Sequence, residues 1–422
     1  MILITVDTLR ADRLGCYGSA RVLTPHMDRL AREGTLFADC VSPVPSTSPS
    51  HATILSGLLP VTHGLRENGA ELSPDVPLLA EAFREGGYRT AAFVSGFPLL
   101  GRFGFDRGFD LYDDRLSDGF TTREGRTQGT ERVGRKTVDA FLRWLDEADG
   151  PFFAWVHLFD PHAVYGAPRP FQRMYYSGSG ERDPSNTSLE GIDLPPYLML
   201  PGVTDVRFPV ALYEGEVAYA DHQIGRLLRG LEERGLLDRA LLVFTADHGE
   251  SMTEHGYHFG HSHFLYEPSL RVPLVFRWQG KVPAGSIVEE PVSLTDLLDT
   301  ILDLAGLGPA VSGEGSSLAP ALAGGTPVER TIILERPPME SGLLFGARRG
   351  PWKYMRTGEG VEELYHLDDD PGELRNLAGA NPERASILRD EVIRKIGEGG
   401  IERPPIDEET RERLRSLGYV DG

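Results

Sequence analysis

The sequence predicts an α/β protein: a large, mostly parallel sheet sandwiched by helices, with a small α+β subdomain at the C-terminus. Two observations predict the large unit. Apolar runs of strand length alternate with longer amphipathic segments, and several of these runs end beside an aspartate. The expected strands are residues 2–6, 88–95, 151–158, 240–245 and 271–277. The expected helices are residues 25–33, 51–56, 76–86, 136–147, 210–234 and 295–305.

A change of composition near residue 310, to Gly, Ser and Pro, separates a second and smaller unit. Short strand-like runs follow at residues 331–335, 342–348, 352–355 and 363–367, and then a charged helix at 382–396. We therefore expect a large domain over residues 1–325 and a small α+β subdomain over residues 326–422. Residues 165–207, rich in Gly, Pro, Ser and Tyr, are expected to form a long lid or substrate loop.

Charge and composition exclude several classes of protein. The formal net charge is −20 over 422 residues, so a nucleic-acid-binding surface is not expected. An anionic ligand would need a local cation, and a bound metal is the obvious candidate. No apolar run reaches the length of a membrane span, and the first residues lack a basic leader. The chain as written is expected to be soluble and cytoplasmic, and a leader removed from the natural protein would be compatible with this.

Three aspartates follow apolar strands directly: Asp7, Asp160 and Asp247. In a parallel sheet, ligands bind at the carboxyl ends of the strands, so these side chains are expected at one edge. Carboxylates brought together in this way need a cation to be tolerated. The sequence therefore predicts a metal site at that edge.

A histidine cluster begins immediately after the strand that ends near Asp247. Five of the twelve histidines lie between residues 248 and 263. Imidazole together with carboxylate suits zinc, manganese or iron, whereas carboxylate alone suits calcium or magnesium. The alternative is a polar surface loop with fortuitous histidines. Within the cluster, His255 and His258 are expected to shape the loop or to support the ligand residues without binding the metal themselves.

The segment TSPSHATILSG, residues 47–57, combines a loop with the start of a helix. A hydroxyl at a helix N-terminus lies among free backbone N–H groups and the positive end of the helix dipole. This favours an alkoxide nucleophile and an anionic substrate. The alternative is that Thr47 and Ser50 serve only as helix caps.

Together these segments resemble the sulfatase family, within the alkaline phosphatase superfamily. The resemblance is carried by ILITVDTLRADRLGCYG, TSPSHATILSG, FTADHGE and HFLYEPSLRVPLVFR, which occur in family order along nearly the whole chain. It implies that Asp7, Asp247 and His248 bind a metal and that Thr47 stands at the nucleophile position. It also implies that Asn68 and His261 contact the substrate's anionic group, and that His162 is a leaving-group acid or an oxyanion contact.

Three positions depart from the sulfatase pattern. Sulfatases carry a Cys or Ser that becomes formylglycine where this chain has Thr47, and a threonine cannot be converted, so no formylglycine is expected. The second acid of the first motif is replaced by Thr8, and the signature arginine by His51. The Thr-x-Pro-Ser-His pattern is more similar to the nucleotide pyrophosphatase/phosphodiesterase branch, in which an unmodified threonine is the nucleophile.

Two models of the site follow. In the first, one metal binds Asp7, Thr47, Asp247 and His248. In the second, a further metal lies about 4 Å away, as in two-metal hydrolases. Its ligands would be Asp160, His162 and either His261 or His263. Zinc or manganese is favoured, and calcium or magnesium is possible. For His157 and for the pair Asp221 and His222, a buried or supporting role is expected.

We therefore expect a metal-dependent hydrolase in which Thr47 attacks a small phosphate mono- or diester or a phosphonate ester. One alternative is a sulfate-ester hydrolase that works without formylglycine. Another is a transferase of the phosphoglycerol or phosphoethanolamine type, and a third is a catalytically silent binding protein. The physiological substrate and the oligomeric state stay open.

Overall fold

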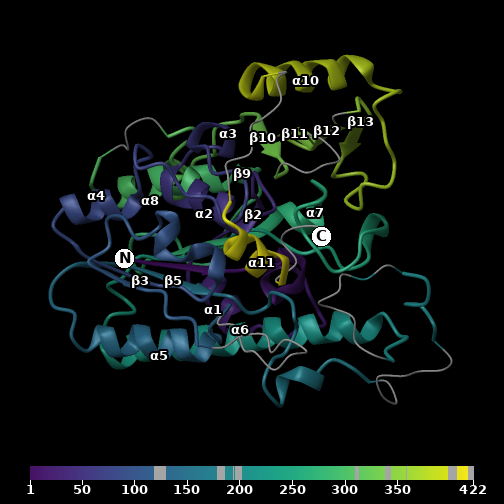
Figure 1. The fold of residues 1–422 in the computed structure, drawn as a ribbon. Helices are drawn as coiled ribbons and strands as arrows, with labels where there is room; N and C mark the ends of the chain where they lie inside the picture. The colour runs from purple at the N-terminus through teal and green to yellow at the C-terminus, as the bar shows by residue number, and fades with distance from the viewer. Residues whose placement is uncertain are drawn as a thin grey trace.

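A large mixed sheet forms the centre of the molecule (Figure 1). The computed structural model describes residues 1–117, 130–177, 186–192, 194, 202–308, 313–337, 344–357, 359–397 and 406–416. The strands of the large sheet are β1 (Ile2–Val6), β2 (Thr35–Val41), β3 (Arg89–Phe93), β4 (Leu111–Asp113), β5 (Phe152–Leu158), β6 (Leu242–Ala246), β7 (Arg271–Arg277), β8 (Ser286–Val288) and β9 (Val292–Ser293). Their order is β4-β3-β5-β1-β6-β7-β2-β8, with β9 also paired to β2.

The strand directions agree with most of the sequence prediction. β4, β3, β5, β1 and β6 are parallel to one another, whereas β7 is antiparallel to both β6 and β2. The five expected strands are all present, with shifts of two residues or fewer at their ends. The expectation of an α/β fold with a mostly parallel sheet is therefore confirmed.

Helices cover both faces of this sheet. α1 (Pro25–Glu33), α5 (Gly134–Leu145) and α6 (Arg207–Glu233) pack together on one face, and α2 (Thr47–Ser56), α4 (Leu79–Glu85) and α8 (Leu297–Ala305) on the other (Figure 1). The shorter helices are α3 (Pro60–His63), α7 (Glu267–Leu270) and α9 (Ala319–Leu322). Strands buried on both faces read as continuous apolar runs, as β1, β5 and β6 do.

A second sheet forms the expected C-terminal subdomain. β10 (Ile332–Glu335), β11 (Leu344–Arg349), β12 (Trp352–Thr357) and β13 (Glu362–His366) form an antiparallel meander, on which α10 (Pro382–Ile396) packs (Figure 1). Partly buried ion pairs join it to the large domain: Arg348 pairs with Asp39, and Lys353 with Glu267. α11 (Glu408–Ser416) returns to the large domain, where Leu414 lies against Gly69.

Part of the expected loop at 165–207 lies outside the described residues, namely 178–185, 193 and 195–201. Its described portion includes a single turn at Phe171–Arg173 that packs on α6. In the described part of the chain, no helix combines the length and apolar character needed to cross a membrane. The boundary between residues 325 and 326 stays a prediction.

Candidate active site

Two neighbouring strands deliver the two carboxylates of the site. Asp7 follows β1 and Asp247 follows β6, and the last residues of these parallel strands, Val6 and Ala246, are paired in register. Both carboxylates therefore emerge side by side at the carboxyl edge of the sheet, and both are fully buried. One ligand atom each from Asp7, Asp247 and His248 lies within 4.8 Å of the others. The structure thus brings the three expected metal ligands together.

The tautomer of His248 follows from its hydrogen bonds. Nδ1 lies 2.9 Å from the carbonyl oxygen of Gly249, which can only accept, so Nδ1 carries the proton. In the neutral ring, Nε2 then presents a lone pair. It lies 3.4 Å from Oδ2 of Asp247 and 3.8 Å from Oδ1 of Asp7. His248 is therefore prepared to bind a cation through Nε2.

The electrostatics of this group fit a bound metal. Burial, reinforced by the charge of Asp247, raises the pKa of Asp7 well above its ordinary value, and burial does the same for Asp247. Oδ2 of Asp247 is buried and accepts no hydrogen bond from the residues that the structure describes. Two buried carboxylates and an imidazole lone pair are a suitable donor set for a divalent cation, whose charge would offset theirs.

Thr47 is the first residue of α2, and its side chain faces the metal ligands. Its Oγ1 lies 3.3 Å from Nε2 of His248, and the nearby Thr47 hydroxyl opposes the rise in the pKa of Asp7. Thr47 is fully buried and lies at the N-terminal end of the helix, where the backbone N–H groups have no partner within the helix. This placement suits a nucleophile next to a cation and an anionic substrate.

Helix capping does not account for the hydroxyls of α2. The N-cap position is Ser46, and its side chain makes no capping hydrogen bond. Ser50 donates instead to the backbone oxygen of Asp247 at 2.7 Å, which connects the helix to the loop that carries Asp247 and His248. The alternative that Thr47 and Ser50 are only caps is therefore wrong.

Asn68 lies beside the N-terminal turn of α2. Its Oδ1 accepts a hydrogen bond from the backbone N–H of Ser48 at 2.7 Å. Because the amide oxygen is used in this way, the NH₂ group is what Asn68 can offer to a substrate oxygen. The Ser48 hydroxyl donates to Pro98 at 2.8 Å, which anchors the same turn from the other side.

Of the two histidines expected to contact the substrate, His261 lies next to His248, and His162 lies next to His261. The ring centroid of His261 is 4.5 Å from that of His248 and 5.3 Å from that of His162. Nδ1 of His162 lies 2.6 Å from the carbonyl oxygen of Ala163, so it carries the proton. Burial, and then the charge of His261, lowers the pKa of His162 to about 3. His162 is therefore neutral at neutral pH, which suits an acceptor or a ligand better than an acid.

The other residues of the two-metal model point elsewhere. Oδ2 of Asp160 accepts a hydrogen bond from the backbone of Gly134 at 2.8 Å, at the start of α5. Nδ1 of His263 lies 2.7 Å from the hydroxyl of Tyr257. Within the described ranges, Asp160, His162, His261 and His263 do not form a second group of ligand atoms within 4.8 Å. Among the described residues, the group that could hold a cation is that of Asp7, Asp247 and His248.

The structure adds residues to which sequence reasoning gave no role at the site. Oε1 of Glu250 lies 3.2 Å from Nδ1 of His261, and its other oxygen is buried. Thr8, directly after Asp7, has a φ of 51°, which is strained for a β-branched residue, and its buried hydroxyl has no partner among the described residues. The sequence signal for Glu250 was its position three residues after Asp247.

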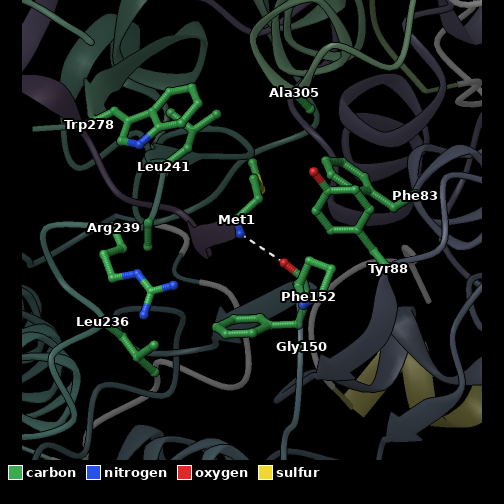
Figure 2. A pocket seen from close by; sticks show the side chains of 12 residues that line it. Met1, Phe83, Tyr88, Gly150, Phe152, Leu236, Arg239, Leu241, Trp278 and Ala305 are labelled. Atoms are coloured by element: carbon green, nitrogen blue, oxygen red, sulfur yellow. Dashed lines mark hydrogen bonds between the residues drawn. The ribbon is translucent and has the colours of Figure 1, made fainter. Parts of the chain in front are cut away.

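A cavity of about 250 Å³ at the opposite edge of the sheet does not belong to this site (Figure 2). Figure 2 shows Met1, Phe152 and Leu241 around it, which lie at the starts of β1, β5 and β6. Its described lining residues carry no carboxylate and no imidazole. This cavity therefore offers none of the side-chain types that gather around Asp7, Asp247 and His248.

Comparison with known families identifies the large domain. A family model described as Sulfatase matches residues 1–307. The chain belongs to the sulfatase family. A second model, described as N-sulphoglucosamine sulphohydrolase, C-terminal, matches residues 253–396 and so spans the second sheet. The expected membership of the sulfatase family, within the alkaline phosphatase superfamily, is confirmed, and family members generally use a divalent metal.

Relatives include sulfatases and phosphonate hydrolases. The chain is 26% identical to an ulvan-active sulfatase of Formosa agariphila, over all of this chain and 85% of that protein. It superposes on the phosphonate monoester hydrolase of Agrobacterium radiobacter with a TM-score of 0.74 and 25% identity, over 96% and 99% of the two chains. The phosphonate monoester hydrolase of Silicibacter pomeroyi gives a TM-score of 0.76 at 24% identity, over 93% and 94%. This sulfatase-family protein is a hydrolase with an alkaline-phosphatase-like fold.

Proposed function

We propose that this hydrolase cleaves phosphate mono- or diesters or phosphonate esters, with Thr47 as an unmodified nucleophile. The observation that carries the proposal is the contact of Thr47 Oγ1 with Nε2 of His248, among the expected metal ligands. A threonine cannot become formylglycine, so the usual sulfatase nucleophile is not formed at this position. The likeness to phosphonate monoester hydrolases supports a substrate with phosphorus at its centre.

Asp7, Asp247 and His248 would hold the divalent cation, and Thr47 would be its fourth protein ligand. When bound, the cation lowers the pKa of the Thr47 hydroxyl and offsets the charge of the substrate. Manganese or zinc suits a set of two carboxylates and one imidazole. This is the one-metal model, which the separate placements of Asp160 and His263 favour.

The reaction would proceed by two displacements at phosphorus. Thr47 loses its proton and its oxygen attacks phosphorus in line, while the bond to the leaving alcohol breaks and the alcohol takes up a proton. Asn68, through its NH₂ group, and His261 contact the equatorial oxygens, and His162 contacts the leaving group. Water then attacks the same phosphorus, the bond to Thr47 Oγ1 breaks, and the hydroxyl is restored. The two inversions give net retention at phosphorus.

Hydrolysis of sulfate esters is the second candidate. It is favoured by the family model over residues 1–307 and by the likeness to the ulvan-active sulfatase. The same side chains would act, with sulfur in place of phosphorus. A phosphoglycerol or phosphoethanolamine-type transferase would need an alcohol acceptor. The grouping of Asp7, Asp247 and His248 argues against a catalytically silent binding protein.

The test compares substrates and variants in one assay. An aryl phosphate monoester, an aryl phosphodiester, an aryl phosphonate and an aryl sulfate are offered to the manganese- or zinc-loaded protein. We expect turnover of at least one phosphorus ester, loss of turnover in Thr47→Ala, and retained metal content in that variant. Thr62→Ala is the matched control away from the site. Turnover of the sulfate alone, or full activity of Thr47→Ala, would overturn the proposal.

A further inference from the structure

Two fully buried histidines lie beneath the expected metal ligands, and neither has a role in the proposed chemistry. His51 is on α2 and His157 is on β5, and their ring centroids are 5.0 Å apart with the planes nearly perpendicular. Thr5 is paired in register with His157, so both side chains are on the face of the sheet that α2 covers. The strand register of His157 and the contact of His51 with Thr5 thus place both imidazoles on this face, near the two carboxylates.

The hydrogen bonds of His51 determine where its proton lies. Nδ1 is 2.8 Å from the carbonyl oxygen of Thr47, which can only accept, so Nδ1 carries the proton. Nε2 is 3.1 Å from the hydroxyl of Thr5, and that hydroxyl accepts a hydrogen bond from the indole N–H of Trp155 at 2.9 Å. The Thr5 proton is thereby directed to Nε2 of His51. In the hydrogen-bonded series Trp155–Thr5–His51–Thr47, each donor therefore faces an acceptor.

The N–H group of His51 also faces a metal ligand. Nδ1 lies 3.5 Å from Oδ2 of Asp247. The other oxygen of Asp247, Oδ1, accepts from the backbone N–H groups of His248 at 2.8 Å and Thr8 at 3.3 Å. The carboxylate is therefore fixed on one side by the backbone and faces His51 on the other. One imidazole contacts both the nucleophile's residue and a metal ligand.

His157 has the opposite tautomer and faces the other carboxylate. Its Nδ1 accepts a hydrogen bond from the backbone N–H of Ser95 at 3.3 Å, and a nitrogen that accepts in this way bears no proton. The proton of the neutral ring is then on Nε2, which lies 3.6 Å from Oδ2 of Asp7. The two rings thus direct one N–H group each toward a carboxylate, His51 toward Asp247 and His157 toward Asp7, and neither contact is short enough to be a hydrogen bond.

We propose that His51 and His157 are positioning residues that orient the carboxylates of Asp247 and Asp7 for the divalent cation, each with one N–H group that lies 3.5 Å or 3.6 Å from a carboxylate oxygen and hydrogen-bonds to it once the cation is bound. Carboxylate ligands are commonly oriented by hydrogen bonds from neighbouring groups, and loss of such a partner typically lowers metal affinity by about 10- to 100-fold. A neutral imidazole supplies the N–H group without adding a positive charge that would compete with the cation. The inference rests on the metal site of the proposed function.

Amide substitutions separate the two tautomers. Asparagine can place its NH₂ group near the position of histidine Nδ1, and glutamine can place its NH₂ group near Nε2. We therefore expect His51→Asn and His157→Gln to keep most of the metal affinity, within about threefold, and His51→Gln and His157→Asn to lose about tenfold or more. The measurement is the dissociation constant for Mn²⁺ of the apo protein, by competition with a chromogenic chelator.

His63 provides the matched control. It is equally buried, its Nε2 lies 3.2 Å from the hydroxyl of Thr53, and its Nδ1 accepts from the backbone of Leu65 at 3.1 Å. His63→Gln should leave the Mn²⁺ affinity unchanged. Equal affinity in all four site variants, or an equal loss in His63→Gln, would overturn the inference. A wild-type protein that binds no Mn²⁺ or Zn²⁺ would instead overturn the metal site of the proposed function.

A second measurement does not depend on how the variants fold. In apo protein labelled with ¹⁵N-histidine, we expect the ring nitrogen shifts of His51 to report a proton on Nδ1 and those of His157 a proton on Nε2. Shifts of a doubly protonated ring, or the reverse tautomer in either residue, would contradict the proposed orientation. Thermal unfolding of each apo variant confirms which ones are folded when their affinities are compared.

Discussion

Oγ1 of Thr47 lies 3.3 Å from Nε2 of His248, on the side of the imidazole that carries no proton. The proton of this ring is directed to Gly249, so Nε2 can accept from the hydroxyl or bind a cation. The proposed nucleophile therefore faces the lone pair of a proposed metal ligand. In the proposed function, this contact would couple the chemistry at Thr47 to metal binding at His248.

Thr47→Ser tests whether the methyl group of the threonine matters once the hydroxyl is kept. The β-branched side chain has a restricted χ1 angle, which holds Oγ1 toward His248, and serine lacks this restriction. We expect turnover to fall by about tenfold or less in Thr47→Ser, and by on the order of 10³-fold or more in Thr47→Val, which keeps the shape and removes the nucleophile. Steady-state kinetics on the best phosphorus ester measures both. Equal activity of the serine and valine variants would contradict a hydroxyl nucleophile.

Asp247→Asn should change stability in opposite directions with and without metal. Burial raises the pKa of Asp247, and the charge of this residue helps to raise that of Asp7, so removal of one carboxylate relieves repulsion in the apo protein. With a chelator, the variant should unfold at a higher temperature than wild type. With Mn²⁺ at 100 times its dissociation constant, wild type should gain about 2.7 kcal/mol and the variant much less.

Thermal unfolding with a chelator and with Mn²⁺ measures both arms of this prediction. Asp75→Asn, at an exposed position, is the control and should follow wild type in both conditions. An apo Asp247→Asn protein that is less stable than wild type would show that repulsion between the carboxylates is not the dominant effect.

The positions of the carboxylates of Asp7 and Asp247 could be predicted because one rule of parallel sheets governs them. Side chains that follow parallel strands meet at one edge, and this placed Asp7 and Asp247 correctly. The same rule does not determine where a side chain points after the strand. Asp160 also follows its strand, but its carboxylate is turned to the first turn of α5, where it accepts from Gly134. The backbone N–H group of Gly134 at the start of α5 orients the carboxylate of Asp160, and the sequence pattern does not reveal this contact.

One strand that was not predicted and one helix start that was misplaced have identifiable reasons. β2 contains Asp39, which interrupts its apolar pattern, and the partner that satisfies this charge is Arg348 in the second sheet. The start of α2 was expected at residue 51 because Pro49 suggested a loop. The helix begins at Thr47, since proline is tolerated in the first turn, where its missing N–H would be unpaired. That shift of one turn is what brings Thr47 to the helix N-terminus.

Lys353→Met should destabilise the protein strongly, although the residue is remote from the chemistry. Its ammonium group is fully buried between Glu267, at 2.9 Å, and Glu373, at 2.7 Å. Removal of the cation leaves two buried carboxylates with less compensation, which typically costs about 3–5 kcal/mol. Urea unfolding at neutral pH measures the change. Lys281→Met, at an exposed position, is the control, and a loss below about 1 kcal/mol in Lys353→Met would contradict a stabilising role for this cluster.

Asp221→Asn should make stability less dependent on pH between about 4 and 7. Oδ1 of Asp221 accepts from the backbone N–H groups of His26 at 3.0 Å and Met27 at 2.8 Å, in the first turn of α1. Burial outweighs these two hydrogen bonds and raises the pKa of Asp221 to about 7. Because the folded state favours the protonated form, its stabilising contribution is complete below the unfolded pKa of about 3.9 and is lost as the pH rises through 7.

The asparagine variant keeps an oxygen that can accept the same two N–H groups, and it has no proton to lose in this range. Wild type should therefore lose stability relative to Asp221→Asn as the pH rises from 5 to 8, and the two urea midpoints should diverge in that direction. Asp238→Asn, whose side chain is 65% exposed, should stay parallel to wild type. If the stability of Asp221→Asn and that of wild type changed in parallel with pH, the two backbone hydrogen bonds would hold the Asp221 carboxylate ionised in spite of its burial. The group that accepts from the first turn of α1 would then be a charged one.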